Sequence, residues 1–474
     1  MNIFFIASES TPYIKTGGLA DVMGSLPKSI GKLGHDVSVV LPLYSQIGEE
    51  YRKDFDFIGY YYVDLDWRRQ YVGVYTTKLD GVQFYFLDNE YYFKRYSIYG
   101  QEDDGERFAY FNKATVQLLK YLNIKPDIVH ANDWHTGLVP LYIKDFARGD
   151  SFYNGIKTVF TIHNIKYQGV FPADMLKLTG LSVEYFHEDG LKFYDCINMM
   201  KAGIVYSDRL TTVSKTYAQE IMFPYFGEGL DGIIRKHRYK LSGIINGIDY
   251  EKYNSKTDDK IASNYDVNTV EIKTENKLKM QEMFGLPVNK DIPVFAMVSR
   301  LVDLKGIDLL TFILDEILAE DIQLVVLGTG DKKYEEIFKD YEYRYPDKMA
   351  ARIYFNEAHS HIIYSGADIL LMPSLAEPCG ISQLISMRYG TVPLVRETGG
   401  LKDTVIPYNK YTGEGTGFGF SNINAHELLF AIRKAIEVYN DKDKFKELVH
   451  RDMMQDNSWT VSSNEYISLY ENIY

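Results

Sequence analysis

Short runs of apolar, β-branched and aromatic residues alternate along the chain with longer stretches in which apolar positions recur every three or four residues. The short runs predict buried strands, and the longer stretches predict helices. In the first half the predicted strands are 2–9, 36–42, 82–88, 127–132, 158–164 and 209–214, with a helix at 108–122. In the second half the predicted strands are 293–300, 322–328, 351–356, 367–373 and 392–396, with helices at 306–318 and 380–390.

This alternation is typical of a parallel sheet that helices cover on both faces. Because it occurs twice, we expect an α/β protein with two doubly wound domains, 1–245 and 246–456. The stretch at about 250–290 is polar and charged, and the hinge is expected near 244–254. In the final segment, 457–474, apolar residues recur at partly helical spacing, so we expect a helix that crosses back to the first domain.

Composition narrows the classes of protein that fit this pattern. Against 52 basic side chains there are 65 acidic ones, and the net charge of -13 argues against nucleic acid or an anionic membrane as partner. Two cysteines cannot build a disulfide framework, and every apolar run is shorter than the ~20 residues of a membrane span. The N-terminus lacks the basic region of a signal peptide, so we expect a cytoplasmic protein. Oligomerisation is left open.

Open α/β sheets bind their ligands beyond the carboxyl ends of the strands. Polar segments follow the predicted strands at this end, and they read "KTGG", "NDWH", "HN", "SRLVDLKG", "AEPCG" and "ETGG". Because the segments come from both halves, we expect them to face one cleft.

The "KTGG" segment contains Lys15, Gly17 and Gly18 between a strand and a predicted helix. Glycines let backbone amides approach an anion closely, and the start of a helix favours negative charge, so this loop suits a phosphate. A plain turn is an equal alternative, because the segment matches neither of the usual glycine-rich phosphate motifs. Asp21 lies about one turn later and either faces the same ligand or is an ordinary first-turn acid.

The second half offers charges of both signs. Arg300 and Lys305 follow a predicted buried strand, and two cations there suit a diphosphate leaving group. The alternative is a pair of solvated surface cations.

Glu377 precedes a helix expected to start near Cys379 and Gly380. Its carboxylate could bind sugar hydroxyls or stabilise positive charge at a sugar carbon, and the alternative is a helix-capping acid.

His163 and Asp133 lie at the ends of predicted strands, where a side chain can face the cleft. His130 and His135 are close to Asp133 in sequence and raise the question of a metal. Their spacing fits a ligand pair on neither a strand nor a helix, and no cysteine joins them. We therefore expect neither a metal nor another cofactor.

Taken together, the segments look like those of the bacterial glycogen synthase and plant starch synthase family. They are "KTGGLADV", "HANDWHTGL", "FTIHNIKYQG", "VSRLVDLKGIDLL", "PSLAEPCGISQL" and "YGTVPLVRETGGLKDTV", in family order. The resemblance runs from end to end and implies two Rossmann-like domains facing a deep cleft, the GT-B arrangement. It also implies transfer of glucose from ADP-glucose to the 4-hydroxyl at the non-reducing end of an α-1,4-glucan such as glycogen. Configuration is retained, and no metal is used.

The resemblance implies roles for the residues around the diphosphate. Lys15 and the amides of Gly17 and Gly18 would contact it. From the second domain, Arg300 and Lys305 would hold the distal phosphate and stabilise the departing ADP.

Other roles concern the sugar and the base. The residues implied around the transferred glucose are Asp21, Asp133, His163 and Asn246. Glu377, with the amides of Cys379 and Gly380, would bind glucose hydroxyls or support an oxocarbenium-like transition state. Phe355, with Tyr354 beside it, stands where the family often has an aromatic ring against the adenine.

One departure concerns mechanism. Many retaining enzymes of this fold have a second glutamate eight positions after the first, and here that position is Ile385. With one carboxylate we favour attack on the same face as the leaving group over a covalent double displacement, which uses two carboxylates. Alternative readings are a UDP-glucose transferase with a small acceptor, a glucan phosphorylase that carries pyridoxal phosphate, and a glucan-binding protein without activity.

Overall fold

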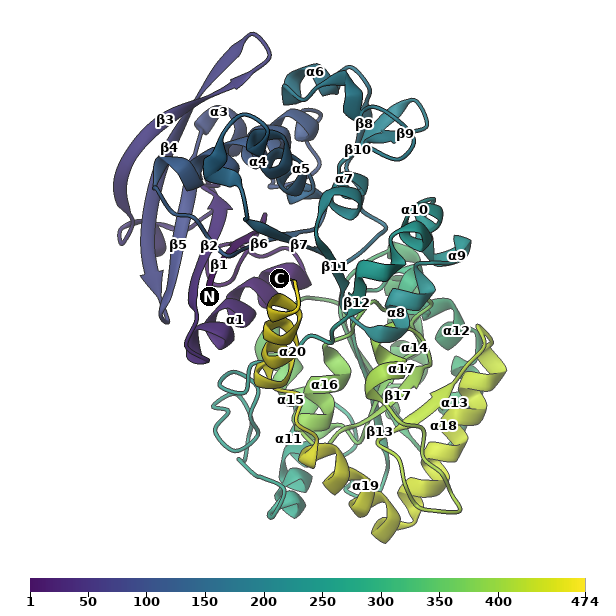
Figure 1. Ribbon diagram of the computed structural model, residues 1–474. Helices are drawn as coiled ribbons and strands as arrows, with labels where there is room; N and C mark the ends of the chain where they lie inside the picture. Colours follow the sequence, from purple (N-terminus) through teal and green to yellow (C-terminus); the bar gives the residue numbers. More distant parts are fainter. Residues whose placement is uncertain (474) are drawn as a thin grey trace. The chain divides into compact units, whose positions relative to one another are not determined.

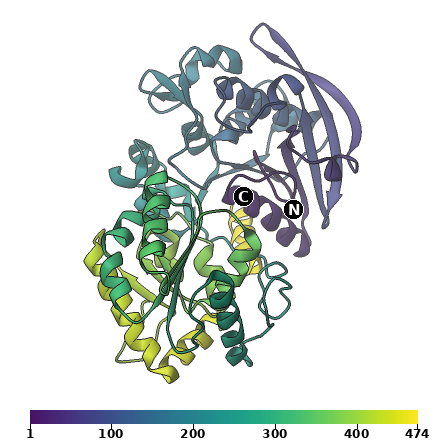
Figure 2. The same ribbon diagram turned by 180° about the vertical axis from the view of Figure 1, so that it is seen from behind.

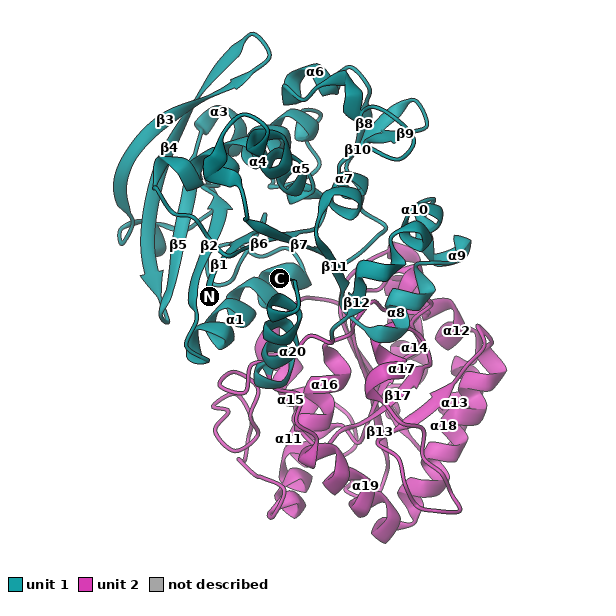
Figure 3. Cartoon of the chain, in the orientation of Figure 1, with its two compact units in different colours: residues 1–244, 459–474 teal, residues 245–458 magenta. Residues whose placement is uncertain are grey.

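The computed structural model describes residues 1–473 and divides into two compact units (Figure 3). Unit 1 contains residues 1–244 together with the residues from 459 onward, and unit 2 contains residues 245–458. Parallel strands alternating with helices build both units, so the predicted doubly wound α/β class is confirmed. The expected C-terminal helix, 457–474, includes Tyr474, which lies outside the described residues.

The large sheet of unit 1 has the strand order β12-β11-β7-β6-β1-β2-β5-β4-β3. Its strands are β1 (Asn2–Ile6), β2 (Asp36–Pro42), β3 (Asp56–Leu65), β4 (Arg68–Leu79), β5 (Val82–Asp88), β6 (Ile128–Asn132), β7 (Lys157–Ile162), β11 (Arg209–Thr212) and β12 (Leu241–Gly243). Neighbours from β12 to β5 are parallel, whereas β4 and β3 join antiparallel at the edge. A small antiparallel sheet orders β8 (Val170–Pro172), β10 (Cys196–Asn198) and β9 (Lys192–Phe193).

The helices of unit 1 come from the first half of the chain and from its C-terminal segment (Figure 1). They are α1 (Gly18–Lys32), α2 (Glu49–Arg52), α3 (Glu90–Phe93), α4 (Asp104–Tyr121), α5 (Val139–Ala147), α6 (Met175–Thr179), α7 (Met199–Tyr206), α8 (Lys215–Glu220), α9 (Pro224–Gly227), α10 (Asp231–Lys236) and α20 (Trp459–Glu471). Figures 1 and 2 both show α20 beside α1. Tyr466 and Tyr470 of α20 are fully buried, and the Tyr470 hydroxyl lies 2.7 Å from Nδ1 of His130.

Unit 2 is built on an all-parallel sheet with the order β15-β14-β13-β16-β17-β18. Its strands are β13 (Val294–Val298), β14 (Gln323–Leu327), β15 (Met349–Arg352), β16 (Ile369–Met372), β17 (Val392–Arg396) and β18 (Phe418–Phe420). Its helices are α11 (Lys273–Phe284), α12 (Ile307–Phe312), α13 (Leu314–Ala319), α14 (Lys332–Arg344), α15 (Glu357–Gly366), α16 (Ser382–Arg388), α17 (Gly399–Thr404), α18 (Ala425–Asn440) and α19 (Lys442–Met454).

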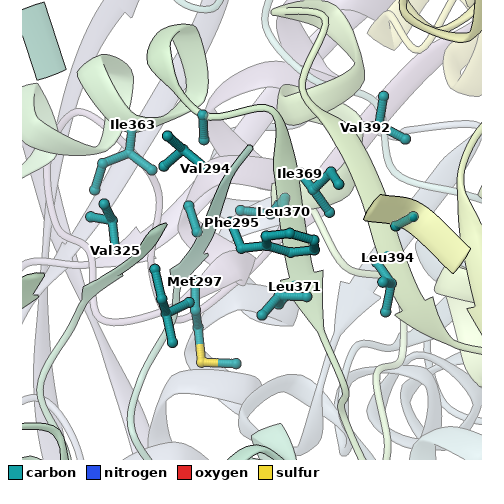
Figure 4. Packing of buried hydrophobic residues seen from close by; sticks show 14 of the residues in the cluster. Val294, Phe295, Met297, Val325, Ile363, Ile369, Leu370, Leu371, Val392 and Leu394 are labelled. Atoms are coloured by element: carbon teal, nitrogen blue, oxygen red, sulfur yellow. The ribbon is translucent and has the colours of Figure 1, made fainter. Parts of the chain in front are cut away.

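The core of unit 2 lies along the central strands, as Figure 4 shows. Phe295, Val325 and Leu370 are fully buried on three neighbouring strands. Each such side chain contributes roughly 1.5–3 kcal/mol by leaving water. These runs read as continuously apolar because both faces of a parallel sheet are covered. No helix within the described chain combines the length and the apolar character that crossing a membrane requires.

Several elements differ from the sequence prediction, which also lacks β8, β9, β10, β12 and β18. The hairpin β3–β4 was not expected, because its outer face is exposed and the pattern is not a clean apolar run; Tyr60 and Tyr62 on β3 are 55% and 47% exposed. The helix expected at 306–318 is two helices, α12 and α13. Between them Ile313 leaves the helical conformation, with φ -113° and ψ 12°.

Strand order identifies one ligand-binding end in each unit. In unit 1 the chain leaves β1 toward β2 on one side and later returns to β6 on the other. In unit 2 it leaves β13 toward β14 and later returns to β16 on the opposite side. Such reversals open a crevice at the carboxyl ends of the two central strands, and ligands bind there in open α/β sheets.

Candidate active site

The loop between β1 and α1 is organised by Glu9, which is only 4% exposed. One oxygen of its carboxylate accepts hydrogen bonds from the Thr16 amide at 2.5 Å, the Thr16 hydroxyl at 2.9 Å and the Gly17 amide at 3.3 Å. Lys15 is exposed, and its ammonium lies 2.7 Å from Oδ1 of Asp21. The Gly17 amide, expected at the diphosphate, therefore has a carboxylate partner here.

Asp133 follows β6 and has a backbone φ of 56°, in the left-handed region that a side chain rarely adopts. Its Oδ1 accepts a 2.8 Å hydrogen bond from the His163 amide at the end of β7. Burial raises the pKa of Asp133 to about 7, although the amides of His163 and Asn164 donate to it and the Glu9 charge adds to the increase. A strained backbone and a carboxyl that titrates near neutrality both occur often at functional sites.

The His163 ring has a defined proton position. Its Nε2 lies 2.9 Å from Oδ1 of Asn132, whose Nδ2 donates to the carbonyls of Ile6 and His130. Because that amide oxygen can only accept, Nε2 carries the proton and Nδ1 is an acceptor. Burial lowers the pKa of His163 to about 3, so the ring is neutral at physiological pH.

In unit 2 the central feature is an ion pair between Lys305 and Glu377. The Lys305 ammonium lies 2.5 Å from Oε2 of Glu377, and the Ser374 hydroxyl donates to the same oxygen at 3.0 Å. The Glu377 residue is 8% exposed. Helix α16 begins at Ser382 with Ile381 as its N-cap residue, so Glu377 does not act as the cap considered from the sequence.

Close backbone packing holds the Glu377 segment. A Cβ atom on Gly399 would lie 1.9 Å from the carbonyl oxygen of Glu377, and one on Gly306 would lie 1.9 Å from that of Pro373. Both glycines have positive φ, 45° and 70°. Only glycine allows three loops to approach this closely, and these loops bring Lys305 and Glu377 together.

Arg396, at the end of β17, ties the same segment down from within. This side chain is 6% exposed and donates to the carbonyls of Ser374 at 2.7 Å and Leu375 at 2.5 Å. Arg300 is exposed in the loop after β13, where an anion could reach it. At this end of the sheet, Arg396 is therefore buried and holds backbone carbonyls, whereas Arg300 is exposed to solvent.

Asn246 and Cys379 lie close together. Burial raises the pKa of the Cys379 thiol to about 12, although the Asn246 backbone amide acts against that increase, and the thiol is protonated and unreactive. Asn246 is 5% exposed, and in the described part of the chain its side-chain oxygen has no hydrogen-bond partner. Gly380 has a φ of 73° just before α16.

The two aromatic residues after β15 differ in exposure. Phe355 is 85% exposed. Tyr354 is half-buried, and its hydroxyl lies 2.8 Å from Nδ1 of His359. Phe355 is thus the ring that is open to a base.

The geometry brings the expected residues into one group per unit. In unit 1 the group comprises Lys15, Gly17, Gly18, Asp21, Asp133 and His163. In unit 2 it comprises Asn246, Arg300, Lys305, Glu377, Cys379 and Gly380, and Tyr354 and Phe355 follow β15 at the edge of the same sheet. His130 is buried, and its two ring nitrogens hydrogen-bond with Thr161 and Tyr470, which leaves neither nitrogen for a ligand. Among residues 1–473, no group of three or more His, Cys, Asp and Glu side chains is arranged to hold a metal ion.

Sequence reasoning did not single out Glu9, Asn132 or Arg396. Each is a buried polar side chain whose partners lie on loops that carry expected site residues. Their position was a usable signal, because each lies at or just beyond the carboxyl end of a strand. Polar side chains at those strand ends are candidates for positioning a ligand loop.

Comparison with known proteins agrees with this geometry. Residues 2–236 match the family model of the starch synthase catalytic domain, and residues 279–450 match that of glycosyl transferases group 1. The glycogen synthase of Finegoldia magna is 57% identical over 474 residues, covering 100% of both chains. That of Lachnospira eligens is 51% identical over 477 residues, again covering 100% of both.

Solved structures show the same relationship. The catalytic domain of starch synthase IV from Arabidopsis thaliana, bound to ADP and acarbose, has a TM-score of 0.91 and 32% identity. The match covers 100% of this chain and 99% of that one. A sucrose-phosphate synthase from Thermosynechococcus elongatus, with a TM-score of 0.61 and 15% identity, shares the fold. The predicted GT-B fold class and family resemblance are confirmed, and the chain belongs to the bacterial glycogen synthase and plant starch synthase family of glycosyltransferases.

Proposed function

We propose that this protein transfers glucose from ADP-glucose to the 4-hydroxyl at the non-reducing end of an α-1,4-glucan, with retention of configuration, in glycogen biosynthesis. The relatives named glycogen synthase match over their full length, and the starch synthase IV structure is bound to ADP. The observation that carries the proposal is the Lys305–Glu377 pair at the ligand-binding end of the unit 2 sheet. In the proposed reaction this pair would provide a cation for the leaving phosphate and, beside it, a carboxylate for the sugar cation.

The leaving group is handled by the cations of unit 2. As the bond between the anomeric carbon and the phosphate oxygen breaks, negative charge grows on the diphosphate of ADP. The Lys305 ammonium and the Arg300 guanidinium would stabilise that charge in a site prepared in advance. Lys305 would then exchange its bond to Glu377 for one to phosphate, which leaves the carboxylate of Glu377 to face the sugar.

The acceptor is proposed to attack from the face that the phosphate leaves. The acceptor 4-oxygen forms the new bond to the anomeric carbon, and its proton passes to an oxygen of the departing diphosphate. Glu377 would stabilise the positive charge that develops on the sugar. A double displacement would need a second carboxylate, and the position eight after Glu377 holds Ile385, which is buried in α16.

The remaining residues would orient the sugar. His163 offers Nδ1 as an acceptor to a glucose hydroxyl, since its Nε2 proton is held by Asn132. Asn246 has a buried side-chain oxygen without a partner in the described structure, and a sugar hydroxyl would satisfy it. Asp133 and Asp21 would lie on the unit 1 side of the glucose, with Lys15 and the Gly18 amide at the diphosphate. Phe355 would stack on the base.

A donor competition assay tests the proposal. Purified protein is given glycogen and labelled ADP-glucose or UDP-glucose, and incorporation into glycogen is measured. We expect incorporation from ADP-glucose to exceed that from UDP-glucose at least tenfold, which is about 1.4 kcal/mol of discrimination. A preference for UDP-glucose would favour a transferase of the same fold with another donor. Binding of glycogen without incorporation from either donor would contradict the proposal.

We also propose that the enzyme works in the cytoplasm. In the described structure Cys196 and Cys379 are free thiols, which suits a reducing compartment. Glycogen is then the macromolecular partner, and the excess of acidic residues disfavours nucleic acid and anionic membranes.

A further inference from the structure

We infer that Glu9 is a positioning residue of the donor site, whose carboxylate sets the loop of residues 15–18 so that Lys15 and the Gly18 amide face the diphosphate. The inference rests on the proposed function and deepens it. Glu9 is not expected to touch the substrate, because its hydrogen bonds are directed at the loop itself.

The contacts describe a carboxylate built into the loop. Glu9 is 4% exposed, and the amide and hydroxyl of Thr16 and the amide of Gly17 converge on its Oε2. A buried carboxylate is unfavourable unless donors satisfy it. Burial raises the pKa of Glu9, while the hydrogen bonds from Thr16, Gly17 and Tyr99 act against that increase. These hydrogen bonds offset the unfavourable burial of the carboxylate, and the same bonds hold the loop in one conformation.

Some hydrogen-bond donors of the loop are bound to Glu9, and others remain for the ligand. Since the amides of Thr16 and Gly17 are directed at Glu9, a phosphate could use them only by displacing its carboxylate. Gly18 is the first residue of the 15-residue helix α1, where backbone amides have no partner within the helix itself. Lys15 is exposed and paired with Asp21, so it can exchange partners. The donor diphosphate would therefore contact Lys15 and the Gly18 amide, and Glu9 would fix the positions of both groups.

A second contact links Glu9 to the other side of the β1/β6 crevice. Tyr99 helps to lower the pKa of Glu9, against the effect of burial, and its hydroxyl lies 2.6 Å from the Ser8 hydroxyl. The Tyr99 ring centroid is 4.4 Å from that of His135, in the segment that follows Asp133. Tyr99 thus contacts both the loop after β1 and the segment after β6. This arrangement would fix the positions of the two sides of the crevice relative to each other.

The rival explanation is that Glu9 acts on the substrate, for example as a base. The two roles predict different behaviour of Glu9→Gln. An amide side chain keeps an oxygen that can accept from Thr16 and Gly17, so it should preserve the loop. An amide cannot take a proton, so a base would lose its function in Glu9→Gln as fully as in Glu9→Ala.

The test is a double-mutant cycle on ADP affinity, measured by titration calorimetry with the full-length protein. We expect Glu9→Ala to weaken ADP binding about tenfold and Glu9→Gln to weaken it less than threefold. In a Lys15→Ala background, Glu9→Ala should cost less than threefold more, because residues that act through one another are not additive. Asp104→Asn is the matched control. Asp104 is also buried, accepts the Gly100 amide and pairs with Arg107, so this change should lower the melting temperature and leave ADP affinity unchanged.

Two results would overturn the inference: Glu9→Ala that binds ADP within twofold of wild type, or losses from Glu9→Ala and Lys15→Ala that multiply fully. If Glu9→Ala does not fold, Thr16→Ala replaces it, since Thr16 is exposed and the change removes one donor to Glu9. It should weaken ADP binding about threefold, and unchanged affinity would equally overturn the inference. Wild-type protein that fails to transfer glucose from ADP-glucose would contradict the proposed function instead.

Discussion

Two of the cations proposed for the donor have an internal carboxylate close by. The Lys15 ammonium is held by Asp21 and the Lys305 ammonium by Glu377. A diphosphate can replace such a carboxylate because both present anionic oxygens to the same donors. Donor binding would therefore replace the carboxylate partner of each cation by a phosphate oxygen, so that neither cation is left without an anionic partner.

The exchange separates the roles of Lys305 and Glu377. We predict that Lys305→Ala lowers turnover and also weakens ADP binding, because the charge it stabilises lies on the diphosphate. Glu377→Ala should lower turnover about 100-fold or more while ADP affinity is retained, because its partner is the sugar cation. The scale is that of one preorganised electrostatic group, ~3 kcal/mol. Steady-state kinetics and calorimetric ADP titration measure both.

A contrary result for Glu377 has a specific form. If Glu377→Ala retains more than a tenth of wild-type turnover and melts several degrees lower, the carboxylate is structural. Ser374→Ala is a useful comparison, because it removes one hydrogen bond to Glu377 and leaves both charges in place. It should reduce turnover less than tenfold.

The pKa of Asp133 makes stability depend on pH. Its carboxyl titrates near 7 in the folded protein, against the usual value of 3.8. Between these values the folded state holds a proton that the unfolded state has lost, so this group makes the protein less stable as pH rises. We predict that the melting temperature of Asp133→Asn relative to wild type increases from pH 5 to pH 8. Asp64→Asn, at an exposed carboxylate, should show no such trend, and a flat difference for Asp133→Asn would contradict the assignment.

At the scale of elements, the site of unit 2 depends on loops that touch through their backbones. The loops after β13, β16 and β17 meet at Gly306, Glu377 and Gly399. The Gly400 amide adds a 3.1 Å hydrogen bond to the Glu377 carbonyl, and the Leu375 amide bonds at 2.8 Å to the Leu304 carbonyl. A change in one loop is therefore transmitted to the reacting carboxylate.

Gly399→Ala tests this packing. Its Cβ would lie 1.9 Å from the Glu377 carbonyl oxygen, so that segment must move by more than an ångström. We predict a loss of turnover of about 100-fold, the scale of a ~1 Å misplacement of a catalytic group. Gly413→Ala is the control, because Gly413 also has positive φ but nothing lies within 4 Å of its Cβ position. It should cost about 1–2 kcal/mol of stability and no turnover, and equal activity of the two variants would refute the claim.

Helix α20 packs against α1 and contributes buried aromatic side chains to unit 1. Deleting the chain from Trp459 onward exposes the sites of Tyr466 and Tyr470 and uncovers α1. Each buried aromatic contributes roughly 1.5–3 kcal/mol, so we predict a melting temperature lower by at least several degrees. Tyr470→Phe removes the hydrogen bond to His130 and should cost about 1 kcal/mol. Truncated protein with wild-type melting and activity would disprove a structural role for α20.

At the scale of the whole molecule, the proposed donor ligands come from both units. Lys15 belongs to unit 1, whereas Arg300 and Lys305 belong to unit 2. One ADP-glucose can contact all three only when the units hold them around it. We predict that saturating ADP lowers the radius of gyration measured by small-angle scattering, because a donor bound by residues of both units would draw the units together and exclude water. A scattering profile that ADP leaves unchanged would argue against closure.

The sequence by itself determined the class of each unit, the order of the motifs and the family. Hydrophobic periodicity is a local property, so it revealed the buried central strands, and the motifs are contiguous segments. The edge hairpin β3–β4 was missed because one of its faces is exposed. The expected residues at the strand ends were found because parallel strands place their carboxyl ends together.

Only the tertiary structure decided which side chains are partners. Lys305 and Glu377 are 72 positions apart and meet because β13 and β16 are neighbours in the sheet. Glu9 holds the loop of residues 15–18, and Asn132 fixes the proton of His163, through contacts that no periodicity encodes. The physical reason is that periodicity reports which face of an element is buried. Strand order and loop packing decide what each buried polar group touches, and they depend on the whole chain.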